Sequence, residues 1–267
     1  MDAATKDWRG IFKPCALAVV ALTIVGCAPI DTLDDVDASP TDPLQEAERR
    51  ILETTDGSYE NGDTSRAYAL KREMLEWDIA PTKLAEFDYW LSFLDFNLAR
   101  LEEHFGDPDQ SLRLLNHALE QLNSTDGSHA EAQALNAILV KSKIPLTPDD
   151  TFELLMSMRE TLDTALSLDQ SSLRVQLAAV MDVVIHVPGF GRASNPDEII
   201  AVALATDPEG QKSSILSHPP TWGRAEVFAL KVIHLRNSGL NDEAELTLEM
   251  ALREYPSHFR LKMLDAQ

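Results

Sequence analysis

The sequence has few cysteines and few basic side chains relative to its acidic ones. Only Cys15 and Cys27 occur among 267 residues, so a framework of disulfide bonds is excluded. Lys and Arg number 23 against 44 Asp and Glu, which gives a formal net charge of −21. Such a field repels phosphate backbones, and we therefore expect no nucleic-acid partner. Hydrophobic residues still make up 44% of the chain, which is enough for a folded core.

The sequence also lacks the common catalytic and metal-binding motifs. None of the seven histidines pairs with another at the spacing of a zinc-binding helix. The glycine-rich segment 187–194 has no Gly-Lys-Ser/Thr and follows a predicted helix, unlike a phosphate-binding loop. No Gly-x-Ser-x-Gly elbow of a hydrolase is present. We therefore predict a protein that is not an enzyme and uses no metal or cofactor.

The first 25 residues are arranged like a secretory signal. Three basic residues, Lys6, Arg9 and Lys13, precede an apolar run at 15–25. That run has about half of the ~20 residues that a membrane-spanning helix needs. A basic segment followed by a short apolar one is typical of a signal peptide that is removed from the mature protein.

The signal-like segment ends in Ile24-Val25-Gly26-Cys27. This tetrapeptide resembles the lipobox of bacterial lipoprotein precursors, which implies a signal peptide at 1–26 and lipidation of Cys27. The resemblance also implies a bacterial cell-envelope protein held at a membrane by its lipid anchor. Ala28, by the sorting pattern of enteric bacteria, indicates the outer membrane facing the periplasm. The alternative is an ordinary cysteine in a buried or membrane-spanning helix.

Residues 27–42 are acidic, contain prolines and lack periodicity, so we predict a flexible tether there. From residue 43 to 267 the apolar residues recur with helical spacing, and no alternating strand pattern is found. Four polar residues each precede a proline that suits the first position of a helix: Asp42, Thr147, Asp107 and Asn195. We predict an all-α domain with helices at 43–55, 64–77, 81–104, 108–122, 128–142, 148–168, 172–187, 196–206, 222–237, 241–254 and 257–265.

Four of the predicted helices share an apolar triplet at positions i, i+3 and i+4. The triplets are Leu115/Ala118/Leu119, Leu162/Ala165/Leu166, Ile200/Ala203/Leu204 and Leu248/Ala251/Leu252. An amphipathic helix alone explains one such triplet, but the four also end alike, in a turn with Asn123, Asp169, Pro208 or Pro256. The shared pattern indicates an internal repeat.

Residues 224–256 resemble a tetratricopeptide repeat (TPR). Gly239, Ala244, Ala251 and Pro256 stand at the spacing of that family's turn glycine, small packing residues and terminal proline. A looser copy contains Gly106 and Ala118. The central alanines are separated by 47, 38 and 48 residues, against about 34 in the family. The resemblance implies a solenoid of about five helix pairs, and the alternative is an irregular helical bundle.

The lipobox, tether and helical repeats together are similar to envelope lipoproteins such as the T component of TRAP transporters. The TPR-like repeats themselves imply a non-enzymatic scaffold that binds protein partners through a groove, whereas the resemblance to the T component points to the following alternative. The alternative is a periplasmic accessory protein of a transporter that binds a small apolar or anionic ligand. An enzyme using two carboxylates, such as a cell-wall hydrolase, is a further alternative, but no particular pair stands out.

Aromatic residues gather around the third predicted helix and could line either the core or the groove. They are Trp77, Tyr89, Trp90, Phe93 and Phe96. A further aromatic residue, Trp222, lies at the end of a proline-containing loop, and we expect its side chain to be exposed.

Overall fold

The computed structural model describes residues 42–123, 125, 127–185, 194–207 and 215–266. Its contacts place Thr41–Gln267 in one compact unit. The predicted signal peptide, the lipobox with Cys27, Pro208 and residues 187–193 of the glycine-rich segment lie outside the described residues.

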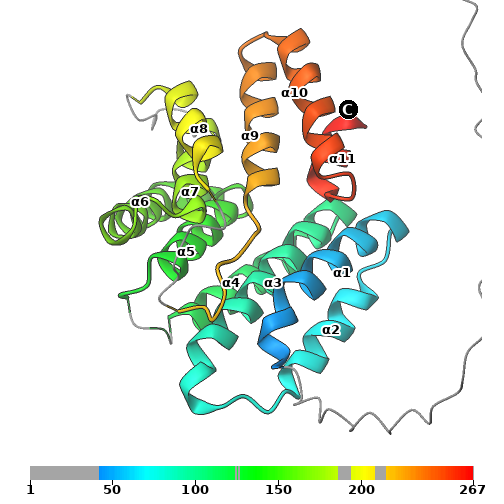
Figure 1. The fold of residues 1–267 in the computed structure, drawn as a ribbon, viewed down its shortest axis with the longest axis vertical. Helices are drawn as coiled ribbons and strands as arrows, with labels where there is room; N and C mark the ends of the chain where they lie inside the picture. The colour runs from blue at the N-terminus through cyan, green and yellow to red at the C-terminus, as the bar shows by residue number, and fades with distance from the viewer. Residues whose placement is uncertain (1–41, 124, 126, 186–193, 208–214, 267) are drawn as a thin grey trace, which may run out of the picture. The chain divides into compact units, whose positions relative to one another are not determined.

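Helix is the regular secondary structure of the described residues, and no strand occurs among them (Figure 1). The α-helices are α1 Ala47–Asn61, α2 Ser65–Leu75, α3 Leu84–Phe105, α4 Pro108–Leu122, α5 Ala130–Lys143, α6 Thr151–Leu168, α7 Leu173–Val184, α8 Pro196–Ala205, α9 Arg224–Asn237, α10 Asn241–Glu254 and α11 Phe259–Asp265. The short 3-10 helices are η1 Pro43–Glu46, η2 Pro81–Lys83, η3 Ile144–Leu146 and η4 Pro148–Asp150. The all-α prediction is confirmed.

Three of the four predicted capping residues make the expected hydrogen bond. The side chain of Asp42 accepts from the backbone N–H of Leu44, that of Asp107 from Gln110, and that of Asn195 from Asp197. Thr147 also precedes the first residue of a helix, Pro148 of η4, as predicted, but its side chain makes no capping hydrogen bond. Its hydroxyl donates to the Lys143 carbonyl at 3.1 Å, because η3 brings Thr147 against the end of α5 and thereby uses the group that would cap the next helix.

Helix α1 is longer than predicted and ends at Asn61 rather than at residue 55. Thr55 and Ser58 are buried on the same face as Ile51. The Thr55 hydroxyl also donates to the Ile51 carbonyl within the helix. Tertiary packing therefore extends α1 until Gly62, whose positive φ of 66° ends it.

Consecutive helices pack as antiparallel neighbours in five pairs, α1/α2, α3/α4, α5/α6, α7/α8 and α9/α10. The first helix of each pair also contacts the first helix of the next pair, from α1 through α9. The last helix, α11, packs on α9 and α10 and also contacts α1, so that the red and blue ends of the described unit meet (Figure 1).

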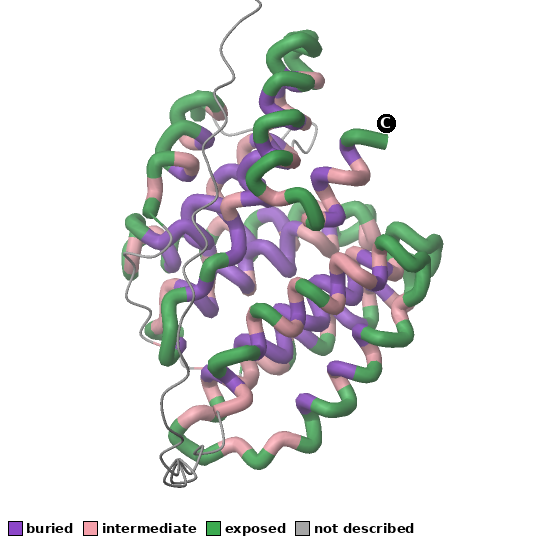
Figure 2. The backbone as a smooth tube through the Cα atoms, turned by 45° about the vertical axis from the view of Figure 1, so that its right-hand side comes forward, coloured by how far each residue is buried: buried purple, intermediate pink, exposed green. Residues whose placement is uncertain are grey.

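Helix α3 lies at the centre of this arrangement. Every residue from Tyr89 to Ala99 is buried, so α3 has no solvent-exposed stripe over three turns. Figure 2 shows the buried segments gathered where the helices face one another, with exposed segments on the outer helices. Four of the five aromatic residues around α3 are therefore core residues, and Trp77 is partly exposed.

Candidate functional site

A segment between α8 and α9, residues 215–223, crosses the described unit and packs against α3; we call it the strap. The ring of Trp222 stacks on Phe93 with centroids 4.4 Å apart, and its indole N–H donates to the Tyr89 hydroxyl at 3.2 Å. Trp222 is only 4% exposed. The expectation of an exposed Trp222 was wrong, because the aromatic surface of α3 buries it.

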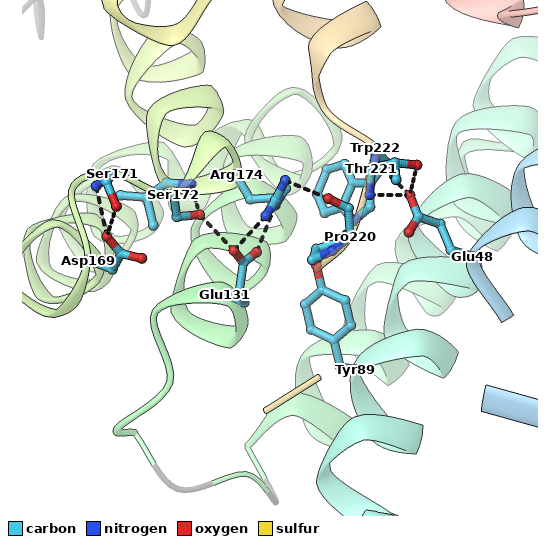
Figure 3. A network of polar contacts seen from close by, with 11 residues as sticks. Glu48, Tyr89, Glu131, Asp169, Ser171, Ser172, Arg174, Pro220, Thr221 and Trp222 are labelled. Carbon is cyan, nitrogen blue, oxygen red and sulfur yellow. Dashed lines mark hydrogen bonds and ion pairs between the residues drawn. The ribbon is translucent and has the colours of Figure 1, made fainter. Parts of the chain in front are cut away.

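Charged side chains hold the strap by its backbone (Figure 3). The guanidinium of Arg174 forms two hydrogen bonds with the Glu131 carboxylate, both 2.9 Å, and donates to the Pro220 carbonyl at 3.0 Å. On the other side, Glu48 accepts from the backbone N–H groups of Thr221 and Trp222 at 2.7 and 2.6 Å. The strap thus covers part of the surface formed by α1, α3 and α7, and its polar groups are satisfied there.

A cavity of about 480 Å³ lies between α3, α5, α7 and α11. Its size falls in the range of small-molecule binding sites. Three cationic side chains line it, Arg100 from α3, Lys141 from α5 and Arg260 from α11. This concentration of positive charge stands out in a chain whose formal net charge is −21.

Lys141 is the most unusual of the three cations. It is only 3% exposed, and its Nζ has no hydrogen-bond partner. Asp182 supplies a nearby counter-charge to Lys141, and its Oδ1 also accepts a hydrogen bond from Arg159 at 3.3 Å. Burial lowers the pKa of Lys141, since the protein does not fully replace the water that the ammonium group loses.

The two arginines are also incompletely paired. Arg100 donates from Nη1 to Glu226 at 3.1 Å and lies over the ring of Phe259 at 4.5 Å, but its Nη2 is buried without a partner. Arg260 makes no hydrogen bond or ion pair with the described part of the chain. Burial, with Arg100 nearby, lowers the pKa of Arg260 to about 10. Lys141 Nζ and Arg100 Nη2 therefore both lack a hydrogen-bond partner within the walls of this cavity.

Glu226 holds Arg100, one of the three cations, in position. Its carboxylate contacts Arg100 and also His258 Nε2, at 3.0 Å. Burial by itself would raise the pKa of the Glu226 carboxyl, but His258 and Arg100 lower it well below its usual range. Glu226 thus stays ionised and orients Arg100, whose Nη2 has no hydrogen-bond partner.

The remaining walls of the cavity are largely apolar. Helix α7 contributes Met181 and the following Ile185, and α11 contributes Phe259 and Met263. Phe96 and Pro145 complete this lining, whereas Glu103, His104 and Ser142 are its other polar residues. The arrangement is suited to an anion that also has an apolar part.

The residues of the repeat pattern lie elsewhere, at turns and helix contacts. Gly106 and Gly239 have φ values of 95° and 76° and lie at the ends of α3 and α9. The alanines of the pattern are fully buried: Ala118, Ala165, Ala203, Ala244 and Ala251. Pro256 is exposed just after α10. None of these residues lines the cavity.

Sequence reasoning missed Arg100, Lys141 and Arg260. One local signal was available for Lys141, because it continues the apolar series Ala134, Ala137 and Ile138 at helical spacing and so lies on the buried face of α5. A lysine at such a position is unexpected in a core. No comparable signal marks the arginines, whose cavity forms only when α11 packs beside α3.

No model of a protein family matches the chain, and comparisons with curated proteins and with solved structures found no match. Within the described helices, none has the length and apolar character required to cross a bilayer. The described residues also contain no group of three or more His, Cys, Asp or Glu that could hold a metal ion.

Proposed function

We propose that the protein is a membrane-tethered binding protein for a small anionic molecule, which occupies the cavity between α3, α5, α7 and α11. The observation that carries the proposal is Lys141, a buried cation without a hydrogen-bond partner that lines this cavity. A buried charge without a hydrogen-bond partner is costly to the fold. A bound anion supplies the missing partner and explains why a lysine occupies this position.

The lipobox-like sequence supports a location at the bacterial envelope, through a lipid on Cys27. The five consecutive helix pairs support a TPR-like solenoid as the origin of the fold. In this proposal the protein resembles the accessory component of a transporter, which collects a ligand close to the membrane. Labelling with radioactive palmitate tests the anchor, since the wild-type protein should be labelled and a Cys27→Ser variant should not.

A scaffold for protein partners is the second candidate function. The exposed apolar side chains on α10, Leu246 and Met250, support it, since they lie one turn apart and are 67% and 47% exposed. The strap weakens it, because Trp222 and its neighbours cover α3, where a peptide-binding groove of the first helices would lie. The scaffold should co-purify with a polypeptide, whereas the binding protein should co-purify with a small molecule.

Native mass spectrometry of the purified full-length protein tests the proposed function. We expect a fraction of the molecules to carry additional mass from a small anion, and this fraction should vanish in Lys141→Met. Lys143→Met is the matched control, because Lys143 lies on the same helix but does not line the cavity. Equal retention by both variants would contradict a role of Lys141 in binding.

A further inference from the structure

We propose that a groove between α1, the strap and residues 254–258 binds an extended basic peptide segment of a partner protein. The segment carries basic residues at its first and fifth positions and an apolar residue at its third. The groove has a volume of about 700 Å³, and we call it the α1 groove. It shares no lining residue with the cavity between α3, α5, α7 and α11. This inference therefore goes beyond the proposed function and does not depend on it.

The α1 groove remains acidic when the cations around it are counted. The carboxylates that line it are those of Glu48, Glu53, Asp56, Glu60 and Glu254. Arg49 lines it as well and is paired with Glu53, and two cations outside the lining, Lys262 and Arg174, act on Glu60 and Glu48. The lining histidines, His218 and His258, each interact with a further carboxylate outside the groove. Five carboxylates thus face three permanent cations, and the excess of two suits a ligand with two basic side chains.

Glu48 and Asp56 each have a carboxylate oxygen that remains accessible. The hydrogen bonds of Glu48 with the strap all end on Oε1, and Asp56 accepts from the backbone N–H of Phe259 through Oδ1. The other two oxygens, Glu48 Oε2 and Asp56 Oδ2, are not fully buried. Burial raises the pKa of both carboxyl groups, because the protein solvates their charge less well than water does. A cation bound beside them compensates this loss.

The spacing of side chains along α1 determines the spacing in the peptide. Glu48, Leu52 and Asp56 follow one another every four residues and all line the α1 groove. They form a stripe with steps of about 6 Å along the helix axis. Side chains on one face of an extended chain recur every second residue, at steps of about 6.6 Å. A basic residue opposite Glu48 therefore places the third residue of the peptide near Leu52 and the fifth near Asp56.

The volume of the α1 groove favours an extended chain over a helix. Spread over the ~12 Å from Glu48 to Asp56, it corresponds to a mean cross-section of about 60 Å². A helix with its side chains is roughly 10–12 Å across and needs about 80–110 Å². An extended chain needs about 48 Å², given spacings of about 4.8 Å between strands and about 10 Å between sheets. The extended segment fits this cross-section, and a helix does not.

Fluorescence anisotropy with labelled synthetic peptides and the full-length protein tests the inference. The matched peptide has the core Lys-Ser-Leu-Ser-Lys, and the control peptide has the same composition in the order Ser-Lys-Leu-Lys-Ser. In the control both lysines point to the opposite side of the chain from the leucine. We therefore expect the matched peptide to bind at least about tenfold more tightly, which corresponds to one charge-assisted contact.

Variants of the protein test the two acidic positions. Glu48→Gln and Asp56→Asn keep an acceptor oxygen for the hydrogen bonds within the protein but remove the charge. Each should weaken binding of the matched peptide by about fivefold to tenfold. Glu76→Gln is the matched control, because it removes the same charge from an exposed residue outside the α1 groove, and it should leave binding unchanged.

Equal binding of the two peptides would overturn the proposal, because the groove would then attract positive charge without reading its spacing. Competition by spermidine at the same concentration as the matched peptide would also overturn it, since a small cation would then suffice. An equal loss in Glu76→Gln and Glu48→Gln would assign the binding to the charge of the whole surface. Circular dichroism checks the fold of the variants, and if they do not fold, the comparison of the two peptides on the wild type decides. Lys141→Met should bind the matched peptide as the wild type does, so failure here leaves the anion-binding proposal standing.

Discussion

Arg174 and Lys141 are two buried cations on neighbouring helices, and they differ in how many hydrogen bonds their charged groups make. Arg174 has no exposed surface, and its guanidinium is matched by the Glu131 carboxylate and the Pro220 carbonyl. Lys141 is almost as deeply buried but has no hydrogen-bond partner. Buried polar groups in native proteins are normally satisfied. The satisfied cation therefore stabilises the fold, whereas the unsatisfied one lines the cavity in which we propose that an anion binds.

The largest effect is expected from Arg174→Met. This change leaves the Glu131 carboxylate buried without its partner and releases the Pro220 carbonyl of the strap. We expect the free energy of unfolding to fall by about 3–5 kcal/mol, as measured by urea denaturation. Arg49→Met, which removes an exposed arginine from α1, should produce no measurable change. An unchanged denaturation midpoint for Arg174→Met would mean that the strap does not depend on this ion pair.

Lys141→Met should act in the opposite direction. Removing an unpartnered buried charge while keeping a side chain of similar length should raise the free energy of unfolding of the ligand-free protein by about 1–3 kcal/mol. The same variant should lose ligand binding, so stability and function should change in opposite senses. Lys143→Met provides the control on the same helix. A destabilised Lys141→Met protein would indicate that Lys141 already has a partner and would remove the contrast with Arg174.

The difference in stability between the wild type and Lys141→Met should depend on pH. The pKa of Lys141 in the folded protein is lowered below its ordinary value of 10.5. Below the lowered pKa both states hold the proton, and the wild type bears the full cost of the buried charge. Between that pKa and 10.5 only the unfolded state keeps the proton, so the wild type gains stability as pH rises. Urea denaturation from pH 7 to 10 should show the two proteins converging, and a constant difference would contradict an uncompensated charge.

The smallest effect is expected from Tyr89→Phe. The variant keeps the ring packing but leaves the indole N–H of Trp222 buried without its acceptor. We expect a loss of about 1 kcal/mol in thermal or urea denaturation, and no change in ligand binding. Tyr255→Phe, which removes a hydroxyl that donates to Glu254 at the surface, should be nearly neutral. Weaker ligand binding by Tyr89→Phe would mean that the strap and the cavity are coupled.

The helices were predictable because their signals are local. Asp107 followed by a proline, and Gly106 and Gly239 at turns, depend on neighbours within a few residues. The hydrophobic spacing gave helices 108–122 and 241–254 with the observed bounds. The end of α1 was missed because buried contacts, which the local sequence does not record, keep Thr55 and Ser58 helical.

The candidate site was not predictable, because it depends on contacts between residues far apart in the chain. Arg100 and Glu226 are 126 residues apart in the chain, and their contact requires α9 to pack near α3. The burial of Trp222 likewise depends on residues more than a hundred positions earlier, Phe93 and Tyr89. The position of Lys141 on the buried face of α5 was the one local clue. The sequence could not show that this position lines a cavity.

The contact between α11 and α1 holds one wall of the cavity in place. The Asp56 carboxylate accepts a hydrogen bond from the backbone N–H of Phe259 at 3.1 Å, and Lys262 pairs with Glu60 nearby. The wall that contains Phe259 and Arg260 thus belongs to α11 and is held in place by α1, about 200 residues earlier in the chain. A chain cut before residue 259 would lack this wall, so removal of α11 should leave the space between α3, α5 and α7 open on that side.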